Sequence, residues 1–101
     1  MRTAKDSQDK GVLTLFRLTE AQIKAVLGRP PESLNELHSC LEQATGDGFV
    51  GLQFEARLAL GEIELALNLP SGRPRLEALE MEARLKGFLS IARKAAAAMQ
   101  R

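Results

Sequence analysis

The segment from Phe49 to Leu69, FVGLQFEARLALGEIELALNL, constrains the fold of this chain most strongly. At the helical period of about 100° per residue, its apolar residues fall on two opposite sides of one helix. One side consists of Leu52, Ala56, Ala59, Leu60, Ile63, Ala66 and Leu67, and the other of Phe54, Leu58, Gly61, Leu65 and Leu69. If either side faced water, the free energy of burying several apolar side chains would be lost. We therefore predict that this helix lies in the middle of a helical stack.

Composition also favours helix. Ala, Leu and Glu are frequent, β-branched residues are sparse, and proline occurs at only four positions, so helix is preferred over strand. A length of 101 residues corresponds to one domain with one core. We therefore predict an all-α protein in which the polar, unpatterned residues 1–11 form a disordered leader and residues 12–101 form a single helical-repeat domain.

Apolar periodicity and helix-breaking residues predict five helices, at 12–27, 31–45, 49–69, 74–86 and 88–100. The first helix carries two apolar stripes. The first stripe consists of large residues: Val12, Leu15, Phe16, Ile23, Val26 and Leu27. The second stripe is mostly small, with Leu18, Ala21 and Ala25, so another helix could approach closely along it. In the second helix, Cys40 is expected at the edge of the apolar stripe.

The fourth helix is also predicted to have two apolar stripes. One consists of Leu76, Leu79 and Ala83, and the other of Ala78, Met81 and Leu85. The last helix is expected to pack inward through Phe88, Ile91, Ala92, Ala95 and Met99. Its alanine run has high helix propensity and little side-chain volume, which suits a terminal helix that packs closely.

Two parts of the chain match each other at an offset of 39 residues. They are Leu37-x2-Cys40-x3-Ala44-x3-Gly48-Phe49 and Leu76-x2-Leu79-x3-Ala83-x3-Gly87-Phe88. A second register, with offsets of 35 and 36, aligns Ala21, Ala56 and Ala92 of the other three helices. Helix-turn-helix pairs repeated at such periods are typical of an α-solenoid, in which each hairpin packs on the next.

These residues resemble the tetratricopeptide repeat. The segment Gly28-Arg29-Pro30-x2-Ser33-Leu34-x2-Leu37-x2-Cys40-Leu41 looks like the second half of that repeat, and Leu60-Gly61 looks like the Leu-Gly pair of its first helix. The chain departs from the family pattern because it has no Trp or Tyr and its periods exceed about 34 residues. The resemblance implies a right-handed stack of two antiparallel hairpins plus a capping helix. An unrelated helical bundle is the alternative.

FEARLALGEIE, followed by LEALEMEARLKGF, also resembles the C-terminal helical-repeat regions of bacterial multidomain signalling proteins. The chain has one cysteine, Cys40, which excludes an intramolecular disulfide. Its start lacks the apolar core of a signal peptide, and it contains no apolar run of the roughly 20 residues that a membrane span needs. We expect a cytoplasmic protein with no membrane partner.

Charge is segregated along the chain although the net charge is only +1. Residues 1–30 carry +3, residues 31–70 carry −6 and residues 71–101 carry +4. The near-neutral total argues against a dedicated nucleic-acid binder. Weak nucleic-acid binding is a third functional hypothesis, since basic residues gather near the C-terminus: Arg84, Lys86, Arg93, Lys94 and Arg101.

No pattern of catalytic or ligand-binding residues occurs in the sequence. His38 is the single histidine, and Cys40, two residues further on, points to a different side of the same helix. There is no Gly-rich phosphate loop and no metal-ligand spacing. We therefore predict no enzyme activity, no cofactor and no metal site.

The predicted function is a non-catalytic protein–protein interaction module that binds a peptide or a partner helix. Homo-oligomerisation, through outer apolar positions of the last helix, is the alternative. The 35-residue register predicts a partner-binding row of Gln22, Arg57 and Arg93, with Glu20 and Glu55 in a second row. The competing interpretation is that Arg57 is an ordinary surface residue that bonds Gln53, with Glu64 nearby.

Overall fold

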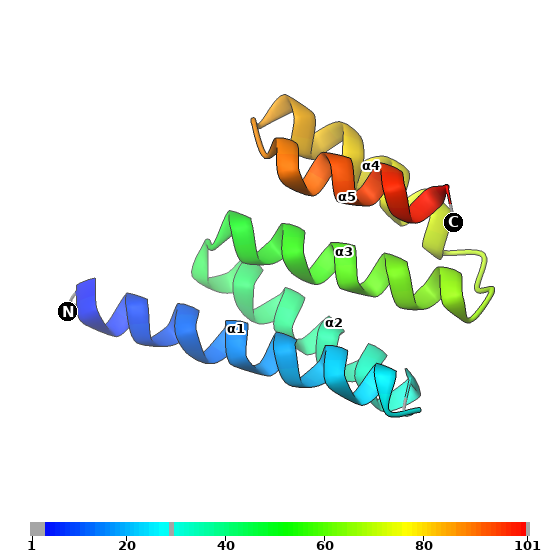
Figure 1. Ribbon diagram of the computed structural model, residues 1–101. Helices are drawn as coiled ribbons and strands as arrows, with labels where there is room; N and C mark the ends of the chain where they lie inside the picture. Colours follow the sequence, from blue (N-terminus) through cyan, green and yellow to red (C-terminus); the bar gives the residue numbers. More distant parts are fainter. Residues whose placement is uncertain (1–3, 29, 101) are drawn as a thin grey trace. The chain divides into compact units, whose positions relative to one another are not determined.

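The computed structural model describes residues 4–28 and 30–100. All regular secondary structure in these ranges is helical, which confirms the predicted all-α class (Figure 1). The five helices are α1 (Ala4–Val26), α2 (Pro30–Asp47), α3 (Val50–Ala66), α4 (Gly72–Leu85) and α5 (Leu89–Met99).

The chain divides into two compact units, one that ends at Gln53 and one that begins at Phe54. In the first unit α1 and α2 form an antiparallel hairpin, which is followed by the first turn of α3 (Figure 1). In the second unit the remainder of α3 is followed by α4 and α5, which pack against each other. The single domain that the sequence predicts over residues 12–101 stays a prediction.

α1 begins earlier than predicted. Residues 4–11, assigned to a disordered leader by the sequence, form its first turns, and residues 1–3 lie outside the described residues. The segment contains no proline, and its Ala, Lys and Gln residues favour helix. A Cβ placed on Gly11 would lie 3.7 Å from Cε2 of Phe49, so the ring gives this part of α1 a packing surface.

α1 uses its small-residue stripe to approach α2. Leu18 and Ala21 are buried, together with Thr14 on the same side. The Ser33 hydroxyl on α2 donates a buried hydrogen bond of 2.6 Å to the Ala21 carbonyl oxygen. The close approach predicted along this stripe is confirmed.

α3 is buried on both predicted sides over its central turns. Phe54, Leu58 and Gly61 are buried on one side. The opposite side contributes Ala56, Ala59 and Leu60. A Cβ placed on Gly61 would lie 2.5 Å from Cδ2 of Leu76, so glycine is required for this approach of α4.

The α3–α4 connection differs from the prediction. α3 ends at Ala66, three residues earlier than predicted, and Asn68 adopts a positive φ of 58° that helix cannot continue. α4 starts at Gly72, two residues earlier than predicted. Pro74 then lies in its first turn, where a missing N–H costs no helical hydrogen bond.

The two segments that match at an offset of 39 have the same local structure. The apolar residues that precede the glycine in each segment are fully buried: Leu37, Cys40, Ala44, Leu76, Leu79 and Ala83. Each helix ends at a glycine with positive φ, 76° at Gly48 and 83° at Gly87. Phe49 N–H then donates to Ala44 O at 2.9 Å, as Phe88 N–H does to Ala83 O at 2.8 Å. Both helices thus end in the same left-handed cap.

Several predicted apolar stripes need correction. Cys40 lies within the buried stripe of α2, not at its edge, because Leu34 and Leu41 are only half-buried. The second stripe predicted for α4 is exposed, with Met81 66% and Leu85 82% exposed. On α5, Ile91, Ala92 and Ala95 are buried as predicted, together with Ala98. Phe88 and Met99 are only partly covered.

Candidate interaction surface

The large apolar stripe of α1 is exposed. Its six side chains and the adjoining Leu13 are between 49% and 87% exposed, and we call these seven residues the α1 apolar face: Val12, Leu13, Leu15, Phe16, Ile23, Val26 and Leu27. Because the small stripe on the opposite side of α1 packs against α2, the large residues face away from α2 and are exposed. This is the largest group of exposed apolar side chains on any one helix of the described chain.

The C-terminal half of this face is grooved. One hollow of about 290 Å³ is lined by Thr19, Gln22, Ile23, Val26 and Leu27. A second hollow, of about 400 Å³, is lined by Glu20, Ile23, Lys24 and Leu27. Ile23 and Leu27 therefore form a ridge with a shallow groove on each side. Such relief accepts the side-chain ridges of another helix.

Charged residues border one edge of the face, and two of them are held by α2. Lys24 forms an ion pair with Glu36, and the hydrogen bond in this pair raises the pKa of Lys24. The Arg17 guanidinium donates to the Ser39 hydroxyl at 3.1 Å. Glu20 is exposed between them in the sequence. The charges thus mark a polar rim beside an uncharged surface.

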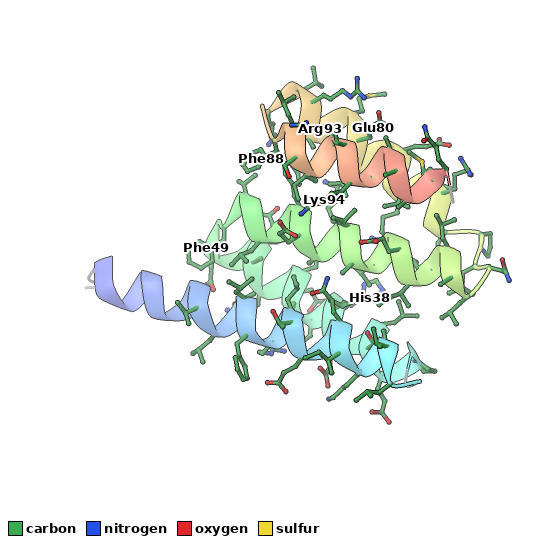
Figure 2. The ribbon with its side chains drawn as sticks, viewed as in Figure 1. His38, Phe49, Glu80, Phe88, Arg93 and Lys94 are labelled. Carbon is green, nitrogen blue, oxygen red and sulfur yellow. The ribbon has the colours of Figure 1, made fainter. Side chains whose placement is uncertain are left out.

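The residues of the predicted partner-binding rows are divided between the two units. Glu20 and Gln22 are exposed on α1 in the first unit. Glu55 and Arg57 are half-buried on α3 in the second unit. Arg93 is exposed on α5 in the same unit (Figure 2). The rows therefore involve both units, and their role in binding a partner stays a prediction.

Arg57 has a structural role within the second unit. Its guanidinium donates to the Glu82 carboxylate on α4 at 2.5 Å and lies 5.7 Å from the ring centroid of Phe54. The hydrogen bond from Arg57 lowers the pKa of Glu82. Phe54 in turn makes an edge-to-face contact with Phe88, with ring centroids 5.0 Å apart. Arg57 thus links α3 to α4, which neither sequence interpretation foresaw.

The two residues that the competing interpretation placed beside Arg57 have hydrogen-bond partners of their own. Gln53 donates its side-chain amide to the Ala44 carbonyl oxygen at 3.5 Å. Glu64 is 5% exposed and accepts hydrogen bonds from Arg75 Nε and from the Ser71 hydroxyl, each at 2.5 Å. The first bond joins the start of α3 to the end of α2, and the others join α3 to α4 and to the turn before it.

One ion pair joins α1 to α2 and another joins α3 to α4, with the basic and acidic residues exchanged. Lys24 on α1 pairs with Glu36 on α2, and Glu64 on α3 pairs with Arg75 on α4. The offsets between the two pairs are 40 and 39 residues. In this contact register Arg57 corresponds to Arg17, not to Gln22. A search for identical residues does not find this correspondence, because the basic and acidic residues are exchanged between the two pairs. Only a search for opposite charges at equivalent positions could have found it.

A separate hollow lies in the second unit, with a volume of about 400 Å³. It is lined by Glu62, Leu65, Ala66, Asn68, Arg73, Ala98 and Met99. Beside it, Arg73 donates to the Met99 carbonyl oxygen at 2.8 Å, which joins α4 to the end of α5. Glu62, Asn68 and Arg73 are among its lining residues, so it is less apolar than the α1 apolar face.

His38 and Cys40, the two residues considered for chemistry in the sequence, have different environments. His38 is exposed on α2 (Figure 2). Cys40 is fully buried, and burial raises the pKa of its thiol. Among the described residues there is no group of three or more His, Cys, Asp or Glu side chains that could hold a metal ion.

No helix among the described residues has the length and apolar character needed to cross a membrane. Comparisons with models of protein families, with curated proteins and with solved structures found no match.

Proposed function

We propose that this protein is a non-catalytic protein–protein interaction module, and that the α1 apolar face is its principal binding surface. The exposure of this face is the observation that carries the proposal. Contiguous exposed apolar surface of a few hundred Å² or more marks interaction sites in soluble proteins. A partner helix that covered Ile23 and Leu27 would remove this surface from water and fill the two grooves.

The proposal includes a tetratricopeptide-like arrangement, a right-handed stack of helical hairpins. The equivalent helix ends at Gly48 and Gly87 support it, as do the equivalent buried residues of α2 and α4. The predicted row of Gln22, Arg57 and Arg93 would be a second contact region in such a stack. Replacing Arg93 by Ala tests that row more cleanly than replacing Arg57, because Arg57 already pairs with Glu82.

Nucleic-acid binding has weaker support than protein binding. Arg93 and Lys94 are exposed on α5, but Glu80 and Glu82 on the neighbouring helix pair with Arg84 and Arg57. A titration of labelled oligonucleotide at low salt checks this function. Binding that weakens steeply as salt is added would support it, since phosphate contacts release counterions.

Site-specific photo-crosslinking tests the principal proposal. A photoreactive amino acid replaces Ile23 at the centre of the face, and a matched variant carries it at Glu42, an exposed residue of α2. We expect discrete protein adducts at position 23 and far fewer at position 42 in the cells from which the sequence comes. Equal, weak labelling at both positions would overturn the proposal. Mass spectrometry of the adducts identifies the occupant.

A further inference from the structure

We infer that the occupant of the α1 apolar face is the same face of a second copy, so that two α1 helices pair antiparallel about a two-fold axis near Thr19 and Glu20. This inference rests on the proposed function and specifies its partner. It is carried by the spacing of the exposed residues, by the size of the face and by the charges at its edge.

The exposed apolar residues of α1 are arranged symmetrically about the midpoint between Thr19 and Glu20. Reflection about this midpoint exchanges Val12 with Leu27, Leu13 with Val26, and Phe16 with Ile23. Leu15 reflects onto Lys24 and has no apolar counterpart. In an isologous interface every contact between two residues occurs twice, with their subunits exchanged, so apolar residues at reflected positions favour such pairing. Antiparallel pairing therefore places apolar side chains at matching heights along both helices.

The size of the face suits a dimer interface. If each of the seven side chains exposes on the order of 70 Å² of apolar surface, the face presents roughly 500 Å². A standard interface buries about 800 Å² per partner, of which about 65% is apolar in homodimers. The α1 apolar face thus supplies about the apolar area that one side of such an interface contains.

The rim charges are complementary in this arrangement. Arg17 reflects onto Gln22 of the partner subunit, which is two residues, or about 3 Å of helix rise, from Glu20 of the partner subunit. Arg17 and Glu20 lie on the same edge of α1, and antiparallel pairing brings those edges together. Two symmetric Arg17–Glu20 pairs would then neutralise the acidic side chains that meet near the axis.

The other exposed apolar side chains do not show this combination. Met81 and Leu85 on α4 are exposed, as is Leu89 on α5. They are few on each helix and have no comparable symmetry. The sequence placed possible self-association on the last helix, whereas the structure favours the first.

Sedimentation of the full chain over a range of concentrations tests the pairing. We expect a monomer–dimer equilibrium, and we expect Ile23→Lys to weaken dimerisation about tenfold or more. Met81→Lys is the matched control, because it adds the same charge at an exposed apolar residue of the second unit. Circular dichroism checks that both variants fold. A chain that stays monomeric up to millimolar concentration overturns the inference.

Cross-linking with a short bis-maleimide tests the antiparallel direction. We expect Val12→Cys mixed with Leu27→Cys to cross-link, whereas each variant alone should not. In antiparallel helices positions 12 and 27 lie at the same height, while two copies of position 12 are about 22 Å apart along the axis. Buried Cys40 stays in place, and thiols are blocked before denaturation. Cross-linking of each variant alone, without the mixed product, would overturn the antiparallel arrangement.

A charge exchange tests the rim. Arg17→Glu should weaken the dimer about tenfold, and the combined Arg17→Glu, Glu20→Arg variant should recover most of that loss. High salt should reduce the difference between these variants. Failure of the exchange to restore dimerisation would contradict the proposed pairing. Adducts at Ile23 with a different protein, from a monomeric chain, would leave the proposed function standing and overturn this inference.

Discussion

Glu64 is the residue whose environment differs most from that of an ordinary helix-surface carboxylate. It is almost fully buried and is held by Arg75 and Ser71. Replacement of Arg75 would remove one cation from a buried carboxylate, which costs more than the loss of an exposed pair. The Glu80–Arg84 pair, in contrast, joins neighbouring turns of one helix at the surface.

We predict that Arg75→Ala lowers the free energy of unfolding by about 1–3 kcal/mol. Arg84→Ala is the control and should change it by less than about 0.5 kcal/mol, as for other exposed pairs within one helix. Urea denaturation measures both variants. If both variants lost the same unfolding free energy, the buried Glu64–Arg75 pair would contribute no more than the exposed Glu80–Arg84 pair.

The Arg57–Glu82 pair makes a prediction about acid stability. Its hydrogen bond lowers the pKa of Glu82 in the folded protein, so the pair contributes stability above the ordinary carboxyl pKa. That contribution is lost as the pH falls through the lowered pKa. The effect should be small, because the Glu82 side chain is about half exposed.

We therefore predict that Arg57→Met makes stability less dependent on pH between about pH 3 and 6. Unfolding by urea across this range measures the slope for both proteins. Lys86→Met is a useful control, because Lys86 only adds a weaker field to Glu82. An unchanged slope in Arg57→Met would show that the pair does not couple folding to protonation.

At the scale of the helix, close approaches depend on the size of one residue. Gly61 on α3 faces Leu76, which is fully buried and has little room to move. Gly46 on α2 is also helical, but no atom would meet a Cβ placed on it within 4 Å. The same substitution should therefore have opposite effects at these two positions.

We predict that Gly61→Ala destabilises the protein by about 1–3 kcal/mol through overpacking. Gly46→Ala should stabilise it by up to about 1 kcal/mol, because alanine favours helix and restricts the unfolded chain. Thermal denaturation compares the two. A stabilised Gly61→Ala variant would contradict the close contact with Leu76.

At the scale of the whole molecule, the α1 apolar face is separate from the residues that hold the fold. Val26 is 87% exposed, whereas Leu18 on the other side of α1 is 3% exposed. Substitution of the first should affect association, and substitution of the second should affect folding. Dependence of Tm on protein concentration distinguishes the two, because self-association stabilises the folded state by mass action.

We predict that the Tm of the unmodified chain rises with concentration and that Val26→Lys removes this rise. At low concentration Val26→Lys should unfold within about 0.5 kcal/mol of the unmodified chain, as exposed substitutions do. Leu18→Ala should cost about 2–4 kcal/mol at every concentration. Calorimetry over a dilution series measures all three. Loss of stability in dilute Val26→Lys would place this residue in the core instead.

Apolar periodicity by itself determined the helical class, the approximate position of each helix and the two buried sides of α3. Local chemistry was sufficient there, because glycine, proline and residue spacing act over a few neighbouring residues. The matched segments that end at Gly48 and Gly87 were also visible, since the same cap needs the same residues.

The tertiary structure alone decided which stripe of each helix is buried. On α1 the mostly small stripe packs and the large one is exposed, because close approach to α2 favours the side where the Ala21 carbonyl is accessible and most side chains are small. Periodicity finds both stripes but carries no information about what lies opposite them. The same holds for Glu64 and Arg57, whose partners Arg75 and Glu82 are distant in sequence and meet only when α3 packs against α4.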